Sequence, residues 1–255
     1  ILFLAYGLSR SQNEIASFKR GFLLHAGAIA IFAGLIVAER DLGTPAVLAA
    51  AGFCMLVLAG VPWSYLALSA AGGAVVVGGL IFSSAYRTKR ILAFLDPWSH
   101  RNEEGYQLMQ SMTAFVNGSV WGQGPGGGEQ KLHYLPEAET DFIFAVWGEE
   151  TGLIGSIFLA AVFLGLFALS LRIAMNAKDL FGTLFAGGAV SLIALQALFN
   201  MMVAVGLLPT KGLPLPFISM GGTSLVVLMG LMGIVVNIGL QAEPVRRRAV
   251  VARTA

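Results

Sequence analysis

Long apolar runs separated by short polar breaks dominate the pattern of this chain. A helix needs about 20 apolar residues to cross the hydrocarbon layer of a membrane. Runs close to that length lie near 22–38, 44–60, 65–82, 153–171, 181–207 and 219–240. Backbone polar groups in lipid must pair within their own segment, so the runs are expected to be helical. The pattern predicts an all-α, polytopic helical membrane protein with about six transmembrane helices and one large loop.

The breaks divide the chain into four parts. We expect the end of one helix and three transmembrane helices in 1–82, a polar loop in 83–152, three transmembrane helices in 153–242 and a basic tail in 243–255. The chain opens with "ILFLAYGLSR", without an initiating Met or a signal-peptide pattern. We therefore expect a C-terminal fragment that begins inside an earlier span.

Composition supports a membrane protein, because 56% hydrophobic residues and a mean hydropathy of +0.78 lie outside the range of soluble domains. The single cysteine, Cys54, sits in an apolar run, so neither a disulfide framework nor a cysteine metal site is expected.

Lys and Arg in the short loops indicate the orientation. One side of the membrane carries nine of these residues and the other side carries two, Arg40 and Lys211. The positive-inside rule places the richer side, with the C-terminal "RRR", in the cytoplasm. The loop 83–152 is then extracytoplasmic, and the net charge of +2 is a topology signal that does not point to nucleic acid.

Acidic residues gather in that loop, which holds nine of the 14 in the chain. Asp141 lies in "TDFIFAVW", where apolar neighbours could desolvate a carboxylate and raise its pKa toward that of a useful base. Structural explanations stay open. Pro136 could start a helix with Glu137 and Glu139 in its first turn, and Thr140 and Asp141 could cap a helix.

Two further loop motifs allow two interpretations each. "YRTKR" at 86–90 could anchor the chain at the membrane interface, or could clamp a lipid-linked phosphate or diphosphate. "GQGPGG" at 122–127 matches G-x-G-x-x-G, but no βαβ unit surrounds it, so a dinucleotide site is rejected. A Gly/Pro-rich turn is expected there, with close approach to a phosphate as the alternative.

The spans carry almost no ionisable groups, which argues against a transporter, because transporters place charges at mid-membrane. Gln196 and Asn200, four residues apart, share a helix face. They either hydrogen-bond between helices or line a lipid path.

Four blocks in order carry a family resemblance. They are "RTKRILAFLDPW", "GYQLMQS", "QKLHYLPEAETDFIFAVWGEETGLIG" and "LLPTKGLPLPFISMGGTSL". With "DLGT" at 41–44, they resemble the SEDS family (shape, elongation, division and sporulation) over nearly the whole chain. The block around Asp141 resembles the division or sporulation branch more than the elongation branch.

The resemblance implies ten helices in the complete protein, a location in the bacterial cytoplasmic (inner) membrane at the division septum, and peptidoglycan glycosyltransferase activity. The implied substrate is lipid II, an undecaprenyl-diphosphate-linked disaccharide pentapeptide, which is polymerised with release of undecaprenyl diphosphate. The implied partners are a class B penicillin-binding protein and other membrane proteins of the divisome.

By the same resemblance, Asp141 would be the general base. Positive charge for the diphosphate would come from Arg87, Lys89, Arg90, Lys131 and Lys211, and a divalent cation, Mg or Mn, could share that role. Glu149 and Glu150 would either hold the metal beside the substrate or only shape the loop.

Three positions depart from the family pattern: Glu139 replaces a usual His, "SMGGTS" at 219–224 replaces "SYGGSS", and Arg40 replaces a Pro. Glu139 is expected to raise the pKa of the base by like-charge repulsion. Two alternatives to the enzyme are kept: a flippase for the same lipid and a non-catalytic divisome scaffold.

Overall fold

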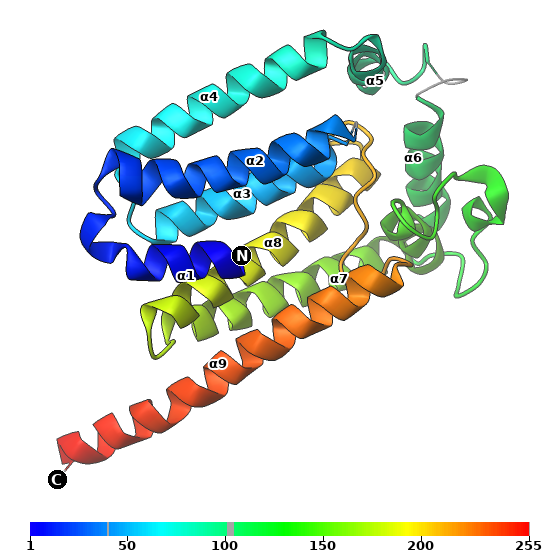
Figure 1. Cartoon of the computed structure of the whole chain (residues 1–255). Coiled ribbons are helices and arrows are strands. Elements are labelled where there is room, and N and C mark those ends of the chain that lie inside the picture. The colour runs from blue at the N-terminus through cyan, green and yellow to red at the C-terminus, as the bar shows by residue number, and fades with distance from the viewer. Residues whose placement is uncertain (40, 101–104, 255) are drawn as a thin grey trace. The chain divides into compact units, whose positions relative to one another are not determined.

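The computed structural model describes residues 1–39, 41–100 and 105–254, and this part of the chain is helical without strands. Its α-helices, labelled in Figure 1, are α1 Leu2–Arg10, α2 Leu24–Ala38, α3 Gly43–Leu58, α4 Trp63–Phe82, α5 Ala85–Leu95, α6 Tyr106–Gly118, α7 Ile143–Met175, α8 Leu180–Ala204 and α9 Gly222–Thr254. A 3₁₀ turn, Gln12–Glu14, and two π-helical segments, Phe18–Leu23 and Gln130–Tyr134, complete them. The predicted all-α, multi-pass membrane class is confirmed.

Five helices in the described ranges are long and apolar enough to cross a membrane, rather than the six predicted. They are Phe18–Ala38, Trp63–Phe82, Ile143–Met175, Leu180–Ala204 and Gly222–Ala242. The sixth predicted span, 44–60, forms the 16-residue helix α3, which is apolar but short. It ends at Leu58 because Gly60 has a left-handed backbone (φ 84°) and Pro62 follows.

The polar loop begins at residue 83 as predicted, after α4 ends at Phe82, but differs from the prediction inside and at its C-terminal end. Helices α5 and α6 lie within 83–152, and α7 begins at Ile143 rather than near residue 153. Gly152, at φ 69° and ψ −165°, joins two helical stretches of α7 through a kink. A side chain is disfavoured in that conformation, so the glycine allows the helix that begins in the polar loop to continue into the apolar stretch of α7.

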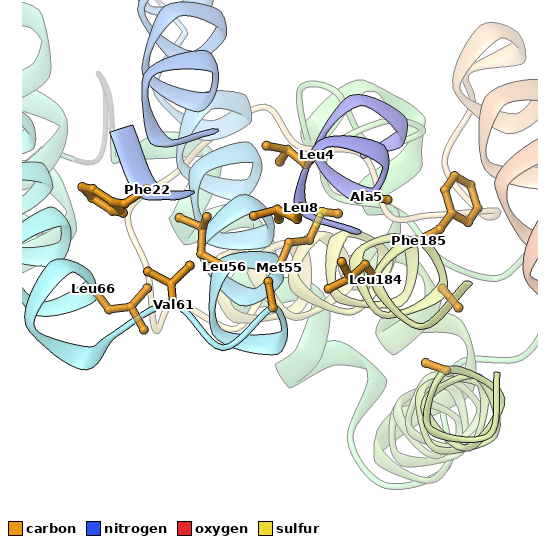
Figure 2. Close-up of a cluster of buried hydrophobic side chains, with 14 of the residues drawn as sticks. Leu4, Ala5, Leu8, Phe22, Met55, Leu56, Val61, Leu66, Leu184 and Phe185 are labelled. Carbon is orange, nitrogen blue, oxygen red and sulfur yellow. The ribbon is translucent and has the colours of Figure 1, made fainter. Parts of the chain in front are cut away.

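Two compact units make up the chain. The first comprises 1–71, 164–195 and 226–255. Within it α2 and α3 lie side by side (Figure 1). Figure 2 shows its core, where Leu4 and Leu8 of α1 meet Met55 and Leu56 of α3, and Leu184 of α8 points into the same cluster. The Nδ1 atom of the buried His25 lies 2.9 Å from the carbonyl of Gly21 in the π-helical segment directly before α2, so one ring nitrogen is hydrogen-bonded.

The second unit comprises 72–163 and 196–225 and holds the acidic region. One of its clusters packs Phe142 against Ala114 of α6 and Val203 of α8. Another packs Phe144 and Leu159 of α7 against Ala197, Ala204 and Leu215. Apolar residues directly after Asp141 are therefore core residues that fix the start of α7.

Some sequence-based expectations fall on residues outside the described ranges. They concern Arg40, Arg101, Glu103, Glu104 and the side chains of the basic tail 243–255.

Candidate active site

Asp141 lies in a tight turn that immediately precedes α7. The backbone N–H groups of Thr140, Asp141 and Phe142 all donate to the carbonyl of Glu137, at 3.2, 3.0 and 3.1 Å. Glu137 itself has a left-handed backbone, φ 56°. That conformation interrupts a right-handed helix, so the helix expected to start at Pro136 is wrong, and α7 starts only at Ile143.

Three successive carbonyls of this turn accept hydrogen bonds from distant parts of the same unit. Glu139 O accepts from Met220 N–H at 2.9 Å, and Thr140 O from the Ser219 hydroxyl at 2.5 Å. Asp141 O accepts from the Asn200 amide nitrogen Nδ2 at 2.7 Å. The backbone of a non-helical segment is thereby fixed at each peptide next to Asp141.

The carboxylate of the half-buried Asp141 lies against Gly212. A Cβ atom added to Gly212 would come within 2.9 Å of Asp141 Oδ2, closer than real contacts allow. Gly212 directly follows the half-buried Lys211 in the segment that joins α8 to α9. Because Gly212 has no side chain, the Asp141 carboxylate can lie next to the segment that contains Lys211.

Arg90 of α5 is attached to the same segment. Its Nη1 donates to the carbonyl of Thr210 at 3.3 Å, and its guanidinium lies over the Tyr86 ring, 4.7 Å from the centroid. The three consecutive residues 210–212 therefore connect three predicted functional residues. Arg90 is bonded to Thr210, Lys211 follows it, and Asp141 lies against Gly212.

The other two cations of the "YRTKR" motif are placed differently. Arg87 Nη1 turns back to the carbonyl of Leu80 in α4, at 2.9 Å. Lys89 is exposed. The structure thus separates the predicted cations into groups with different surroundings.

Glu149 is fully buried in the first part of α7 and binds the loop before it. Its Oε2 accepts from the backbone N–H of Gln130 at 3.0 Å, and its Oε1 accepts from Asn117 Nδ2 of α6 at 3.2 Å. A Cβ on Gly128 would lie 2.8 Å from Oε2, so this glycine also makes room for a carboxylate. Such burial of a carboxylate requires hydrogen-bond partners, and these two donors supply them.

Glu150 joins the predicted cation Lys131, whose Nζ lies 2.5 Å from Oε1 in a partly buried ion pair. Beside it, the N–H groups of Gln123 and Gly124 donate to the backbone carbonyls of Glu149 and Glu150, both at 3.0 Å. The "GQGPGG" segment is thus a turn whose amides bind the "GEE" backbone. Gly122, Gly124 and Gly126 have left-handed φ values of 79°, 90° and 82°, which favour glycine.

A metal site does not emerge from these acids. Within the described ranges, no three His, Cys, Asp or Glu side chains are close enough to share an ion. The Glu149 carboxylate is bonded to Gln130 and Asn117, and Glu150 to Lys131. We therefore assign no ligand set for Mg or Mn within residues 1–39, 41–100 and 105–254.

Residues that the sequence did not single out hold Asp141 in place. Ser219 lies in the departing "SMGGTS" block, and Gly212 lies in the "PTKG" block without a distinguishing signal of its own. Asn200 was recognised as polar, but its partners are the carbonyls of Asp141 and Leu213 rather than a neighbouring helix. The four-residue spacing of Gln196 and Asn200 predicted that they share a helix face, but it could not predict these partners.

Comparison with known sequences finds relatives that belong to one family. Residues 1–243 match the FtsW/RodA/SpoVE family, described as "Cell cycle protein". A "Probable peptidoglycan glycosyltransferase FtsW" of Geobacter sp. (strain M18) is 42% identical over 241 residues, which cover 93% of this chain and 65% of that protein. "Stage V sporulation protein E" of Bacillus subtilis (strain 168) is 39% identical over 238 residues, 93% of this chain and 65% of that protein. The chain thus spans 65% of the length of these two relatives.

Solved structures show the same fold. One, described as "Structural coordination of polymerization and crosslinking by a peptidoglycan synthase complex", matches with a TM-score of 0.75 and 25% identity, over 94% of this chain and 68% of that chain. The rod shape determining protein RodA of Thermus thermophilus matches with a TM-score of 0.63 and 24% identity, over 94% of this chain and 64% of that chain.

Proposed function

The chain belongs to the FtsW/RodA/SpoVE family of cell cycle proteins, and we propose from this membership and from the site that it is the catalytic part of a peptidoglycan glycosyltransferase. The enzyme polymerises lipid II into glycan strands during cell division and releases undecaprenyl diphosphate. Relatives at 42% and 39% identity carry the names of a probable glycosyltransferase and a sporulation protein, which supports a role in the division or sporulation branch.

Asp141 acts as the general base in this proposal. Its carboxylate takes the proton from the 4-hydroxyl of the acceptor sugar while the hydroxyl oxygen attacks the anomeric carbon of the donor. The bond between that carbon and the diphosphate oxygen breaks, and the electron pair leaves with undecaprenyl diphosphate. Inversion at the anomeric carbon needs a base on the acceptor side, and the leaving diphosphate needs positive charge rather than a second acid.

The observation that carries the proposal is the position of Asp141. Three long-range hydrogen bonds fix its turn, and its carboxylate lies against Gly212, which follows Lys211. Lys211 and Arg90, which is bonded to Thr210, are the cations we assign to the diphosphate. Arg87, Lys89 and Lys131 are assigned to the rim of the site, where Lys131 also pairs with Glu150.

Partners and location follow from the relatives. The solved complex named for coordinated polymerisation and crosslinking supports assembly with a class B penicillin-binding protein, alongside other divisome membrane proteins. The apolar helices support a location in a membrane, where they would hold the undecaprenyl tail between them. We propose that this membrane is the bacterial cytoplasmic membrane at the division septum. A divalent cation, Mg or Mn, is proposed only as a requirement to be measured by adding EDTA and restoring each ion.

The decisive experiment compares glycan strands made from fluorescent lipid II by the complete protein and its Asp141→Asn variant, each reconstituted with its penicillin-binding partner. Glu129→Gln is the matched control, because Glu129 is an exposed acid of the same loop. We expect polymer from the parent and the control, and none from a folded, partner-bound Asp141→Asn variant. Equal polymer from all three would refute Asp141 as the base, whereas no polymer from the parent would favour a flippase or a scaffold.

A further inference from the structure

Two amide side chains lie one helical turn apart on α8 and contact the segment between α8 and α9. Gln196 Nε2 donates to the carbonyl of Pro214 at 2.9 Å. Asn200 Nδ2 donates to the carbonyl of Leu213 at 2.7 Å and also to the carbonyl of Asp141 at 2.7 Å. Both amides therefore hold the same segment, but only Asn200 connects that segment to Asp141.

The burial of Asn200 strengthens its two hydrogen bonds and fixes the separation of the peptides that they join. Only 1% of the Asn200 surface is exposed, and a hydrogen bond is stronger in such a low-dielectric interior than in water. One planar amide nitrogen serves two carbonyls, so the separation between the Asp141 peptide and the Leu213 peptide is limited by the size of that group. The chain that carries Lys211 and Gly212 is thereby held at a constant distance from Asp141.

Ser219 binds the carbonyl of Thr140, the residue directly before Asp141. Its hydroxyl accepts from Leu215 N–H at 2.6 Å and donates to Thr140 O at 2.5 Å. The hydroxyl thus connects the same segment to the residue directly before Asp141. Asn200 lies on α8 and Ser219 lies in the segment between α8 and α9, and together they bind two consecutive carbonyls, those of Asp141 and Thr140.

We propose that Asn200, assisted by Ser219, is a positioning residue that sets the reach of the Asp141 carboxylate toward the acceptor hydroxyl. This inference rests on the proposed role of Asp141 as the base. Neither side chain takes part in proton transfer. Their contribution is geometric, and a displacement of about 1 Å in such a site can lower the rate about 100-fold.

The first test compares Asn200→Leu with Gln196→Leu in the complete protein bound to its partner, with fluorescent lipid II as substrate. Asn200→Leu removes the bonds to both Asp141 and Leu213, while Gln196→Leu removes a bond to the same segment without touching Asp141. We expect kcat to fall about 10- to 100-fold in Asn200→Leu with KM within about 2-fold of the parent. Gln196→Leu should retain kcat within about 3-fold.

A second pair keeps the test decisive if Asn200→Leu does not fold. Ser219→Ala removes the hydroxyl, and Ser219→Thr retains it. We expect Ser219→Ala to lower kcat about 10-fold and Ser219→Thr to restore most of the loss, with similar melting temperatures for both variants in detergent. A kcat deficit that follows the hydroxyl but not the melting temperature indicates positioning rather than general stability.

The outcomes separate this inference from the proposed function. If Asp141→Asn is inactive while Asn200→Leu and Ser219→Ala keep the parent kcat, Asp141 stands as the base and the positioning role is refuted. Equal losses in Asn200→Leu and Gln196→Leu, or in Ser219→Ala and Ser219→Thr, also refute it, because they indicate only a structural hold. Full activity of Asp141→Asn would overturn both proposals.

Discussion

The buried carboxylate of Glu149 accepts a hydrogen bond from the backbone N–H of Gln130 at 3.0 Å. Together with the bond from Asn117 Nδ2, this contact attaches the glycine-rich loop and the end of α6 to the first part of α7. An acidic side chain in this position can therefore hold the loop in place without contacting substrate.

Removal of that carboxylate should destabilise the protein. In Glu149→Ala, the buried N–H of Gln130 and the amide of Asn117 lose their acceptor, which costs about 1–3 kcal/mol for each unsatisfied group. We expect a lower melting temperature in detergent, followed by intrinsic fluorescence. Glu129→Ala is the control, since that exposed neighbour should leave the melting temperature unchanged. Equal melting of Glu149→Ala and the parent would contradict a structural role for Glu149.

The Lys131–Glu150 pair gives a prediction that separates loop stability from substrate binding. If Lys131 mainly pairs with Glu150, Lys131→Met and Glu150→Gln should have similar effects, and a double-mutant cycle should give a coupling of about 1 kcal/mol in stability. If Lys131 also binds diphosphate, Lys131→Met should raise the KM for lipid II well above that of Glu150→Gln. Melting temperatures and lipid II kinetics of the four proteins decide between these two roles.

Gly212→Ala should lower activity without unfolding the protein. The new Cβ would lie 2.9 Å from Asp141 Oδ2, and the mobile end of that side chain is the part that must move. We expect kcat to fall about 10-fold or more, with little change in melting temperature, because Gly212 is exposed. Gly221→Ala is the comparison: its nearest side-chain atom would be at an ordinary 3.7 Å. The same kcat for both alanine variants would argue against displacement of Asp141.

Gly152→Ala should disrupt the kink of α7. Its φ of 69° is strained for a residue with a side chain, and a Cβ would lie 2.4 Å from Gly122 N and Val120 O. Strain alone costs about 1–3 kcal/mol, and the clash with backbone adds to it, so a sharp loss of monodisperse protein is expected in size-exclusion chromatography. Gly165→Ala on the same helix has open space around its Cβ and should behave like the parent. A Gly152→Ala protein with parent yield and melting temperature would be inconsistent with this kink.

Local signals in the sequence predicted much of the fold. The length and hydropathy of the runs indicated six spans, of which the structure confirms five within the described residues. Boundaries were less reliable where a single backbone conformation decided them. The left-handed Glu137 prevents a helix from starting at Pro136, and the kink at Gly152 lets α7 begin at Ile143. A left-handed non-glycine residue leaves almost no trace in composition.

The residues of the candidate site could be predicted from the sequence, but most of their contacts could not. Asp141, Arg90 and Lys211 could be chosen from their chemistry and from family motifs, although they are far apart in the sequence. Glu149, Glu150 and Lys131 could also be chosen, but the pairing of Lys131 with Glu150 and the bonds of Glu149 to Gln130 and Asn117 could not. Hydrogen-bond partners depend on which segments meet, and no local pattern contains that information.

The sequence by itself determined that this is a polytopic helical membrane protein with an acidic polar region between its apolar segments, because insertion into lipid depends on the apolar content of each segment alone. Only the tertiary structure decided how Asp141 is held. Its own carbonyl accepts from Asn200, the carbonyls of Thr140 and Glu139 accept from Ser219 and Met220, and its carboxylate lies in the space left by Gly212. The Asn200 and Ser219 bonds join residues that are 59 and 79 positions apart in the chain, and they form only when the folded core brings the segments within hydrogen-bond distance.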